Sequence, residues 1–194
     1  MKKMFLIVLA TIAVITASAQ KISYDKVEAD GLRLIGCSSE TFRSFSDKVV
    51  LSLSMSAAIK DGDVTYFLDA SLQSSNPITA PANARMLIKT QKGNVLTLEG
   101  FSSQPTEDTL GHVQSVSGIV VKTFTINLPY KVSTEDINLL TTEGIAKIRI
   151  ELDGDKPYEK EWKKDKIGSF LAKEFKLLEE SAGKDKRGSF EDGF

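Results

Sequence analysis

The stretch that decides the fold is VVLSLSMSAAIK, residues 49–60. Apolar side chains occupy alternate positions along it, and the positions between them include Ser52, Ser54 and Ser56. A period of two is the pattern of a β-strand with one buried and one solvated face. The stretch therefore predicts a long strand in an antiparallel sheet that keeps one face wet.

A turn and a second strand follow directly. Asp61-Gly62-Asp63 supplies residues that favour tight turns, and VTYFLDASLQ (64–73) again alternates. Its expected inward residues are Tyr66, Leu68, Ala70 and Leu72. Together the two stretches predict a long hairpin.

The alternation recurs further along the chain. ARMLIKT (84–90) and NVLTLEGF (94–101) predict a second hairpin around Gln91-Lys92-Gly93. GIVVKTFTINLPY (118–130) predicts a strand that Pro129 ends, because proline has no amide proton for a sheet. Two further strands are expected in IAKIRIEL (145–152) and PYEKEW (157–162), on either side of Asp153-Gly154-Asp155. The inward residues expected in these strands are Phe124, Ile126, Leu128, Ala146, Ile148, Ile150 and Leu152, and Tyr158 and Trp162 are expected to share a face.

Two helices are expected. Ser133 is a candidate N-cap, with acidic residues in the following turn and Gly144 after the last, so residues 133–144 predict a short helix that connects two strands. Residues 168–180 predict a C-terminal amphipathic helix, because Leu171, Phe175 and Leu178 recur at helical spacing. We expect this helix to cover an open edge or end of the sheets.

Many strands and few helices predict a mainly β fold: an antiparallel β-sandwich or a partly open barrel, with a short connecting helix and the C-terminal helix. We expect a single domain over residues 20–180. Residues 181–194 are rich in glycine, serine and charge, and we expect a disordered tail. The tail repeats KDKIGSF (164–170) as KDKRGSF (184–190), and because Arg187 replaces the apolar Ile167, we interpret the repeat as chance similarity rather than as a docking segment.

Residues 1–19 have the form of a signal peptide. Lys2 and Lys3 precede an apolar run of about 12 residues, which is shorter than the roughly 20 of a membrane-spanning helix. Ala17-Ser18-Ala19 then has the small-x-small form of a cleavage site. We expect cleavage after Ala19, a secreted or periplasmic protein, and no stable membrane insertion afterwards.

Leu34-Ile35-Gly36-Cys37 has the form of a lipobox, in which a cysteine becomes lipidated. A lipobox must end the apolar run, yet six charged residues separate Ala19 from Cys37. Each such charge costs about 2.5–3.5 kcal/mol at the centre of a membrane helix, so we expect no lipid at Cys37. Cys37 is also the only cysteine, which rules out an intrachain disulfide, and we interpret it as a small core residue.

The charge balance bears on partners. Without Lys2 and Lys3 the chain has 23 basic and 26 acidic residues, a formal net charge of −3. A mildly acidic chain without a basic block argues against a nucleic-acid partner.

No residue motif points to catalysis or to a cofactor. One cysteine and one histidine cannot assemble a zinc cluster, so we expect no metal or other cofactor. His112 lies in the turn-rich EDTLGHVQS (107–115), and we interpret it as a solvated loop residue. The two Asp-Gly-Asp triplets do not continue as calcium loops and are interpreted as turns. We interpret the aromatic residues Tyr66, Phe67, Tyr158 and Trp162 as packing residues, the alternative being a ligand platform.

The segments occur in an order that resembles a known group. ADGLRLIG (29–36), SDKVVLSLSM (46–55), TYFLDASL (65–72), ARMLIKTQKGNVLTLEG (84–100), GIAKIRIEL (144–152) and KKDKIGSFLAKEF (163–175) are similar to segments of small, uncharacterised secreted β-rich proteins of anaerobic gut bacteria. The resemblance covers most of residues 28–178 and implies the fold and secretion. It implies no activity, so no catalytic or binding residue is assigned.

We therefore expect a non-catalytic binding module for an unknown protein or glycan ligand. The alternative is a carboxylate-dependent hydrolase that acts on a cell-envelope or dietary polymer, and a third possibility is a subunit of an envelope assembly. An enzyme should show a deep pocket with converging carboxylates or with His112. A binding module should show an exposed aromatic patch or an open edge strand.

Overall fold

The computed structural model of the chain describes residues 20–43, 48–101, 109–116, 119–154 and 156–183. Within these ranges the elements are, in chain order, β1 (Ile22–Val27), β2 (Arg33–Cys37), β3 (Glu40–Phe42), β4 (Val49–Lys60), β5 (Asp63–Ser74), β6 (Arg85–Thr90), β7 (Val95–Glu99), β8 (Thr109–Val116), β9 (Ile119–Val132), α1 (Thr134–Glu143), β10 (Ile145–Ile150), β11 (Tyr158–Glu161) and α2 (Ile167–Ala182).

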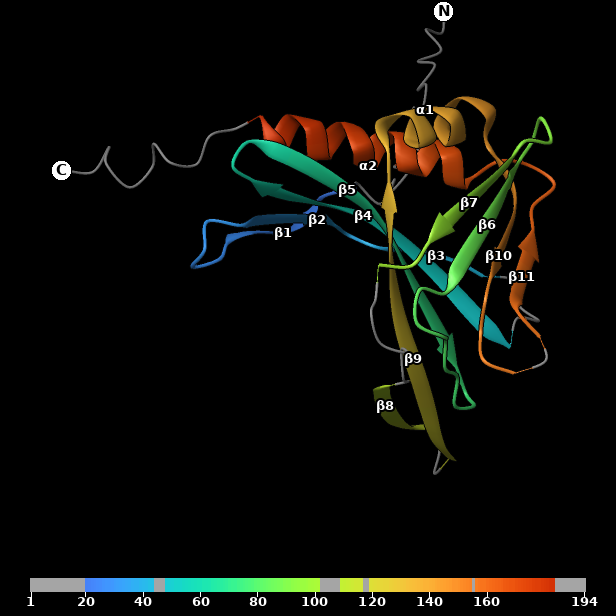
Figure 1. Ribbon diagram of the computed structural model, residues 1–194. Helices are drawn as coiled ribbons and strands as arrows, with labels where there is room; N and C mark the ends of the chain where they lie inside the picture. The colour runs from blue at the N-terminus through green and yellow to red at the C-terminus, as the bar shows by residue number, and fades with distance from the viewer. Residues whose placement is uncertain (1–19, 44–47, 102–108, 117–118, 155, 184–194) are drawn as a thin grey trace, which may run out of the picture.

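The strands form two antiparallel sheets (Figure 1). The larger sheet has the order β1-β2-β4-β5-β9-β8, with the short β3 beside β4, and the smaller sheet has the order β11-β10-β6-β7. The sheets are not closed into a barrel, so the predicted mainly β fold is confirmed in its sandwich-like form. Their buried residues and those of both helices belong to one hydrophobic cluster.

The hairpin of β4 and β5 is confirmed and forms the centre of the larger sheet. Each strand has twelve residues, and they pair from Val49↔Ser74 to Lys60↔Asp63. Asp61 and Gly62 both have positive φ, 53° and 93°, which matches the twist of the strands in a two-residue turn. The alternate apolar residues are buried, and the serines between them stay partly exposed. The predicted wet face is therefore present.

The prediction that Pro129 ends its strand is wrong, because β9 continues to Val132. Pro129 pairs with Asp69 of β5, and its carbonyl oxygen accepts the Phe101 N–H at 2.7 Å. The ring nitrogen of Pro129 faces the same side as that carbonyl, away from β5. Since the pairing of β8 with β9 reaches only to Thr125, no strand there requires the missing amide proton.

His112 lies in β8 opposite Thr123, so its predicted place in a loop is wrong. The register shifts between Leu110 and His112, and such a bulge breaks the alternation by which a strand is recognised. A second shift, between Ile145 and Lys147 of β10, buries Ile145 and leaves Ala146 only half-buried. The prediction that Ala146 points into the core is therefore wrong, whereas Ile148 and Ile150 are buried as expected.

Helix α1 has the predicted bounds and connects the two sheets. The Ser133 hydroxyl accepts the Asp136 N–H at 3.1 Å, and the Asp136 carboxylate accepts the Ser133 N–H at 3.2 Å. These reciprocal bonds form a capping box that satisfies donors of the first turn. Because β9 ends at Val132 and β10 begins at Ile145, the helix carries the chain from the larger to the smaller sheet.

Helix α2 lies across the inner face of the larger sheet, not at an edge or end as predicted. The ring of Phe170 packs edge-on against Phe42 of β3, and that of Phe175 against Tyr66 of β5, with centroid distances of 5.5 and 5.1 Å. The helix thus spans several strands, because its apolar stripe is wide enough to complete the core. It ends at Ala182, two residues beyond the predicted domain. The predicted signal peptide and residues 184–194 of the predicted tail lie outside the described residues.

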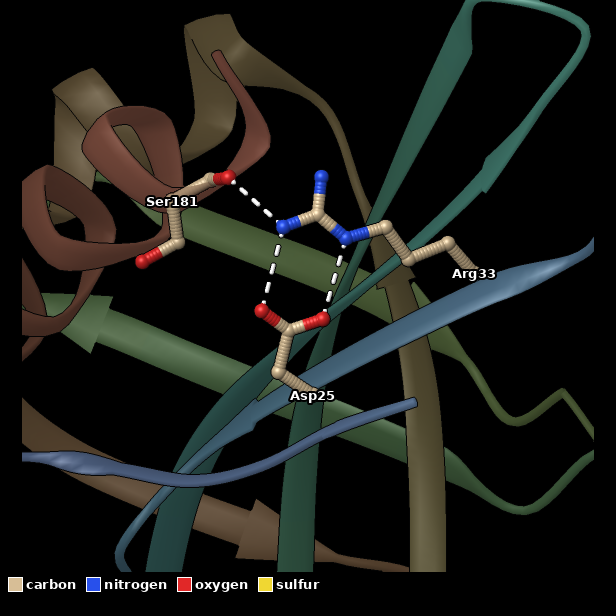
Figure 2. A network of polar contacts seen from close by, with 3 residues as sticks. All are labelled: Asp25, Arg33 and Ser181. Atoms are coloured by element: carbon tan, nitrogen blue, oxygen red, sulfur yellow. Dashed lines mark hydrogen bonds and ion pairs between the residues drawn. The ribbon is translucent and has the colours of Figure 1, made fainter. Parts of the chain in front are cut away.

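An arginine ties the end of α2 to the first hairpin (Figure 2). The guanidinium of Arg33 in β2 donates to both carboxylate oxygens of Asp25 in β1, each at 3.0 Å, and to the Ser181 carbonyl at 3.0 Å. The two charged side chains are only 11% and 15% exposed. Because free carbonyls at a helix C-terminus carry partial negative charge, the arginine stabilises the last turn of α2 as well as β1.

Candidate functional site

The outer face of the larger sheet is the surface opposite α2 and the core. It is formed by the alternate residues of β4, β5 and β9 that point away from the core, and the register places Ser54 beside Asp69, and Asp69 beside Pro129. All of these outward residues are at least partly exposed. The outer face is therefore a mainly polar surface on the central strands of the sheet, where β5 is paired on both sides.

A hollow of about 390 Å³ opens at the middle of the outer face, and we call it the central hollow. Four serines, one asparagine and one aspartate supply its polar side chains. The lining residues are Ser39, Ser52, Ser54, Asp69, Ala70, Ser71, Asn127, Leu128 and Pro129. The hollow thus offers hydroxyl and amide groups, which both donate and accept hydrogen bonds, beside one acceptor carboxylate.

Asp69 is the only carboxylate among the described residues that line the central hollow. Its Oδ2 accepts the Ser56 hydroxyl proton at 2.6 Å, and no described residue bonds its Oδ1. Burial raises the pKa of Asp69, and the hydrogen bond from Ser56 opposes that shift. Glycoside hydrolysis ordinarily needs two carboxyl groups roughly 5–9.5 Å apart across the scissile bond, and this hollow provides one.

Aromatic side chains lie beside the central hollow. The rings of Phe67 in β5 and Phe101 after β7 are 5.4 Å apart, and Phe101 is 65% exposed. The Tyr24 ring covers Gly36 so closely that a Cβ at Gly36 would lie 2.3 Å from it. Gly36 pairs with Ser56, which is one of the outer-face serines. Because Ser56 also pairs with Phe67, the Tyr24 ring and Phe67 lie in one row across the strands and border the polar hollow at the same end.

A second hollow, the terminal hollow, has a volume of about 500 Å³ and opens where β5 ends. Val50 and Gln73 form the next outward pair after Ser52 and Ser71, so part of this hollow continues the outer face. Ser74 and Lys122 occupy the alternate positions of β5 and β9 and reach the hollow from the other face of the sheet. Its lining residues are Lys48, Val50, Gln73, Ser74, Ser75, Asn76, Lys122 and Thr123. Among the described residues, two cationic side chains and no acidic one line it, in contrast to the central hollow.

Glu174 of α2 fills a gap in the larger sheet on its inner side. β2 pairs with β4 as far as Gly36↔Ser56, and β3 begins its pairing at Glu40↔Leu53. Met55 therefore pairs with Leu68 of β5 on one side and has no partner strand on the other. The Met55 N–H donates to Glu174 Oε2 at 2.8 Å instead. The carboxyl group is fully buried and its Oε1 has no partner within the described part of the chain. Burial raises the pKa of Glu174 to about 8, although the Met55 bond opposes the shift.

Cys37 lies in the core beside the same helix. It is 5% exposed, and its Sγ lies 3.7 Å from the Glu174 carbonyl oxygen. Burial, with a smaller contribution from the Glu174 charge, raises the pKa of the thiol to about 12. A buried, protonated thiol is a poor nucleophile, so the interpretation of Cys37 as a core residue is confirmed.

The aromatic residues singled out from the sequence do not form one platform. Tyr66 packs inward on Phe175, Tyr158 is buried in the smaller sheet, and Trp162 lies under the Lys160 ammonium at 5.9 Å. Their interpretation as packing residues is confirmed. Only Phe67 reaches the outer face, where its partner is Phe101, a residue that sequence reasoning did not select.

The other candidates provide no metal site. Asp61 and Gly62 form the β4–β5 turn, as interpreted, whereas Asp155 of the second triplet lies outside the described residues. In the part of the chain that the structure describes, no group of three or more histidine, cysteine, aspartate or glutamate side chains is placed to hold a metal ion.

Sequence reasoning did not select Asp69, although a signal for it existed. A two-residue turn at Asp61-Gly62 determines the register of the hairpin and therefore places Asp69 opposite Ser54. No comparable signal places Asn127 of β9 beside them, since that strand is more than fifty residues away in the chain.

Comparison with known proteins gives no relative. No family model matches the chain, and neither a curated protein nor a solved structure is similar to it. Across the described ranges, no helix has the length and apolar character needed to span a membrane. Arguments about function therefore come from the outer face and its two hollows.

Proposed function

We propose that the protein is a secreted or periplasmic, non-catalytic module that binds a carbohydrate chain on the outer face of its larger sheet. The observation that supports this most is the central hollow, where serine, asparagine and aspartate side chains lie beside exposed aromatic residues. The proposal keeps the glycan and sets aside the protein ligand of the sequence-based expectation, because the lining is hydroxyl-rich and not apolar.

The chemistry of the lining complements that of a sugar. Sugar hydroxyls donate and accept hydrogen bonds, as do the side chains of Ser52, Ser71 and Asn127, and the Oδ1 of Asp69 accepts. Phe101 offers an exposed apolar ring on which the C–H face of a sugar can pack. Because these groups belong mainly to paired strands, little conformational entropy is lost when a ligand binds.

The hydrolase alternative has less support. Among the described residues the central hollow holds one carboxylate, whereas retaining and inverting glycosidases use two. The Asp69→Asn variant separates the two functions. A module that only binds should release no reducing ends from any polysaccharide, with or without this substitution. Release of reducing ends by the parent protein, abolished in Asp69→Asn, would establish the hydrolase instead.

Affinity electrophoresis tests the proposal. The purified protein is run in native gels that contain soluble xylan, mixed-linkage β-glucan, galactan or pectic galacturonan. We expect at least one polysaccharide to retard it, and we expect Phe101→Ala and Asn127→Ala each to weaken binding by about 2- to 10-fold, since one ring contact or hydrogen bond is worth about 0.5–1.5 kcal/mol.

A matched control tests whether a loss of glycan binding is specific to substitutions on the outer face. Val95 in β7 is 60% exposed on the smaller sheet, so Val95→Ala removes similar exposed apolar surface far from the outer face. It should leave retardation unchanged, and all three variants should unfold at the temperature of the parent. Failure of every glycan to retard the protein, or an equal loss in Val95→Ala, contradicts the proposal.

A further inference from the structure

The terminal hollow differs in charge from the central hollow. Lys48 and Lys122 line it, both are exposed, and neither forms an ion pair within the described ranges. Its other polar lining residues are neutral. The mature chain is expected to be mildly acidic. The described lining of the terminal hollow is instead positively charged, because it contains two lysines and no acidic residue.

The two hollows are close enough for one extended ligand. From Asp69 to Gln73 is four residues along β5, a distance of roughly 13 Å at about 3.3 Å per residue. Ser71 and Thr125 lie on the outer face between them, so the path stays polar. A chain of several sugars that binds the central hollow therefore reaches the terminal hollow when it follows the direction of the strands.

We infer that the terminal hollow selects an anionic sugar residue, one with a carboxylate or sulfate group, within the glycan that the outer face binds. The inference rests on the proposed function and deepens it. Lys48 and Lys122 bind the anionic group, while Gln73 and Asn76 offer amide hydrogen bonds to the neighbouring hydroxyls. The central hollow, with its single carboxylate and no cation in its lining, takes a neutral part of the same chain.

Matched glycan pairs test the charge preference by isothermal titration calorimetry. The pairs are galacturonan oligosaccharides without and with methyl esters, xylan oligosaccharides with and without glucuronic acid groups, and galactan oligosaccharides with and without sulfate. In the pair whose backbone binds, we expect the anionic form to bind more tightly and its advantage to shrink as salt is raised. The anionic group in the pair that shows tighter binding identifies the preferred substituent as a carboxylate or a sulfate.

The double variant Lys48→Gln/Lys122→Gln tests the residues. One exposed lysine changes affinity for an anion by about 1.4- to 5-fold, so we expect the pair to weaken binding of the anionic form by about 2- to 30-fold. Binding of the neutral form should not change. The control Lys89→Gln/Lys173→Gln removes the same charge from exposed lysines of β6 and α2, and it should behave as the parent.

The failures of the two proposals are distinguishable. If the neutral and anionic forms bind equally well, or if the two double variants lose affinity alike, the inference is wrong while carbohydrate binding stands. If none of these glycans binds, the proposed function fails and the inference fails with it. Thermal unfolding of each variant confirms that a loss of affinity does not come from a loss of folding.

Discussion

The buried Glu174 makes the stability of this fold depend on pH in an unusual direction. Its pKa is raised from an ordinary value of 4.5 to about 8 in the folded protein. Between these values the folded chain retains a proton that the unfolded chain has lost, so the free energy of unfolding falls as pH rises from about 4.5 to about 8. Below that window both states are protonated and above it both are ionised, so this group adds no further change.

The size of the effect follows from the shift. A difference of one pKa unit corresponds to about 1.4 kcal/mol, so the full window is worth at most about 5 kcal/mol, and about 3 kcal/mol of it is lost by pH 7. Glu174→Gln replaces the ionisable group with a neutral one of the same shape, and its amide oxygen can still accept the Met55 N–H. Both the amide and the protonated carboxyl carry a donor that lacks a partner, so these costs largely cancel.

We therefore expect Glu174→Gln to match the parent near pH 4 and to be more stable by about 1–3 kcal/mol at pH 7. The assay is urea unfolding at pH 4, 5.5, 7 and 8.5, followed by circular dichroism and by the fluorescence of Trp162, the only tryptophan. Contributions from other acids cancel in the difference between variant and parent. Glu179→Gln, an exposed position of the same helix, is the control and should show no such difference.

Two results would refute the reasoning. A constant difference between Glu174→Gln and the parent at all four pH values would show that the carboxyl does not titrate within the window. A variant less stable than the parent at pH 7 would show that the ionised carboxylate is stabilised in the gap between β2 and β3, contrary to the expected cost of burying a charge.

Four further predictions follow from single residues. The Cys37 thiol should react with iodoacetamide at pH 8 far more slowly in the folded protein than in urea, and equal rates would contradict its burial. Cys37→Ser should leave localisation unchanged, and the intact mass of the mature parent protein should correspond to an unlipidated chain that begins at Gln20; a parent mass that corresponds to a lipid-modified chain beginning at Cys37 would contradict the signal-peptide prediction. Arg33→Gln should lower the free energy of unfolding by about 1–3 kcal/mol, and Arg33→Lys should restore little of it because lysine cannot bond both oxygens of Asp25; full rescue by lysine would show that charge alone matters. Ser133→Ala should cost about 1 kcal/mol in urea unfolding, and no loss would show that the capping box contributes nothing.

Local sequence patterns predicted the elements that depend only on residues close together in the chain. The β4–β5 hairpin combines strict alternation with a two-residue turn, and α1 combines an N-cap serine with a glycine after its last turn. In both cases the structure depends on neighbours a few residues apart, and such interactions are visible in the sequence. The strand β8 was missed because a bulge interrupts its alternation. The prediction for Pro129 was wrong because only the tertiary structure shows that its ring nitrogen faces away from β5, on a side where β8 no longer pairs with β9.

The sequence by itself determined that apolar and polar residues alternate along long antiparallel strands and that a solvated face lies opposite the core. It also showed that no metal-binding or nucleophile motif is present. Only the tertiary structure determined which side chains meet on the solvated face and in the core. The order β4-β5-β9 brings Asn127 beside Asp69, and the packing of α2 places Glu174 in the gap beside Met55. Both arrangements join residues more than fifty positions apart, and the packing of the whole core, rather than any local preference, selects which distant segments meet.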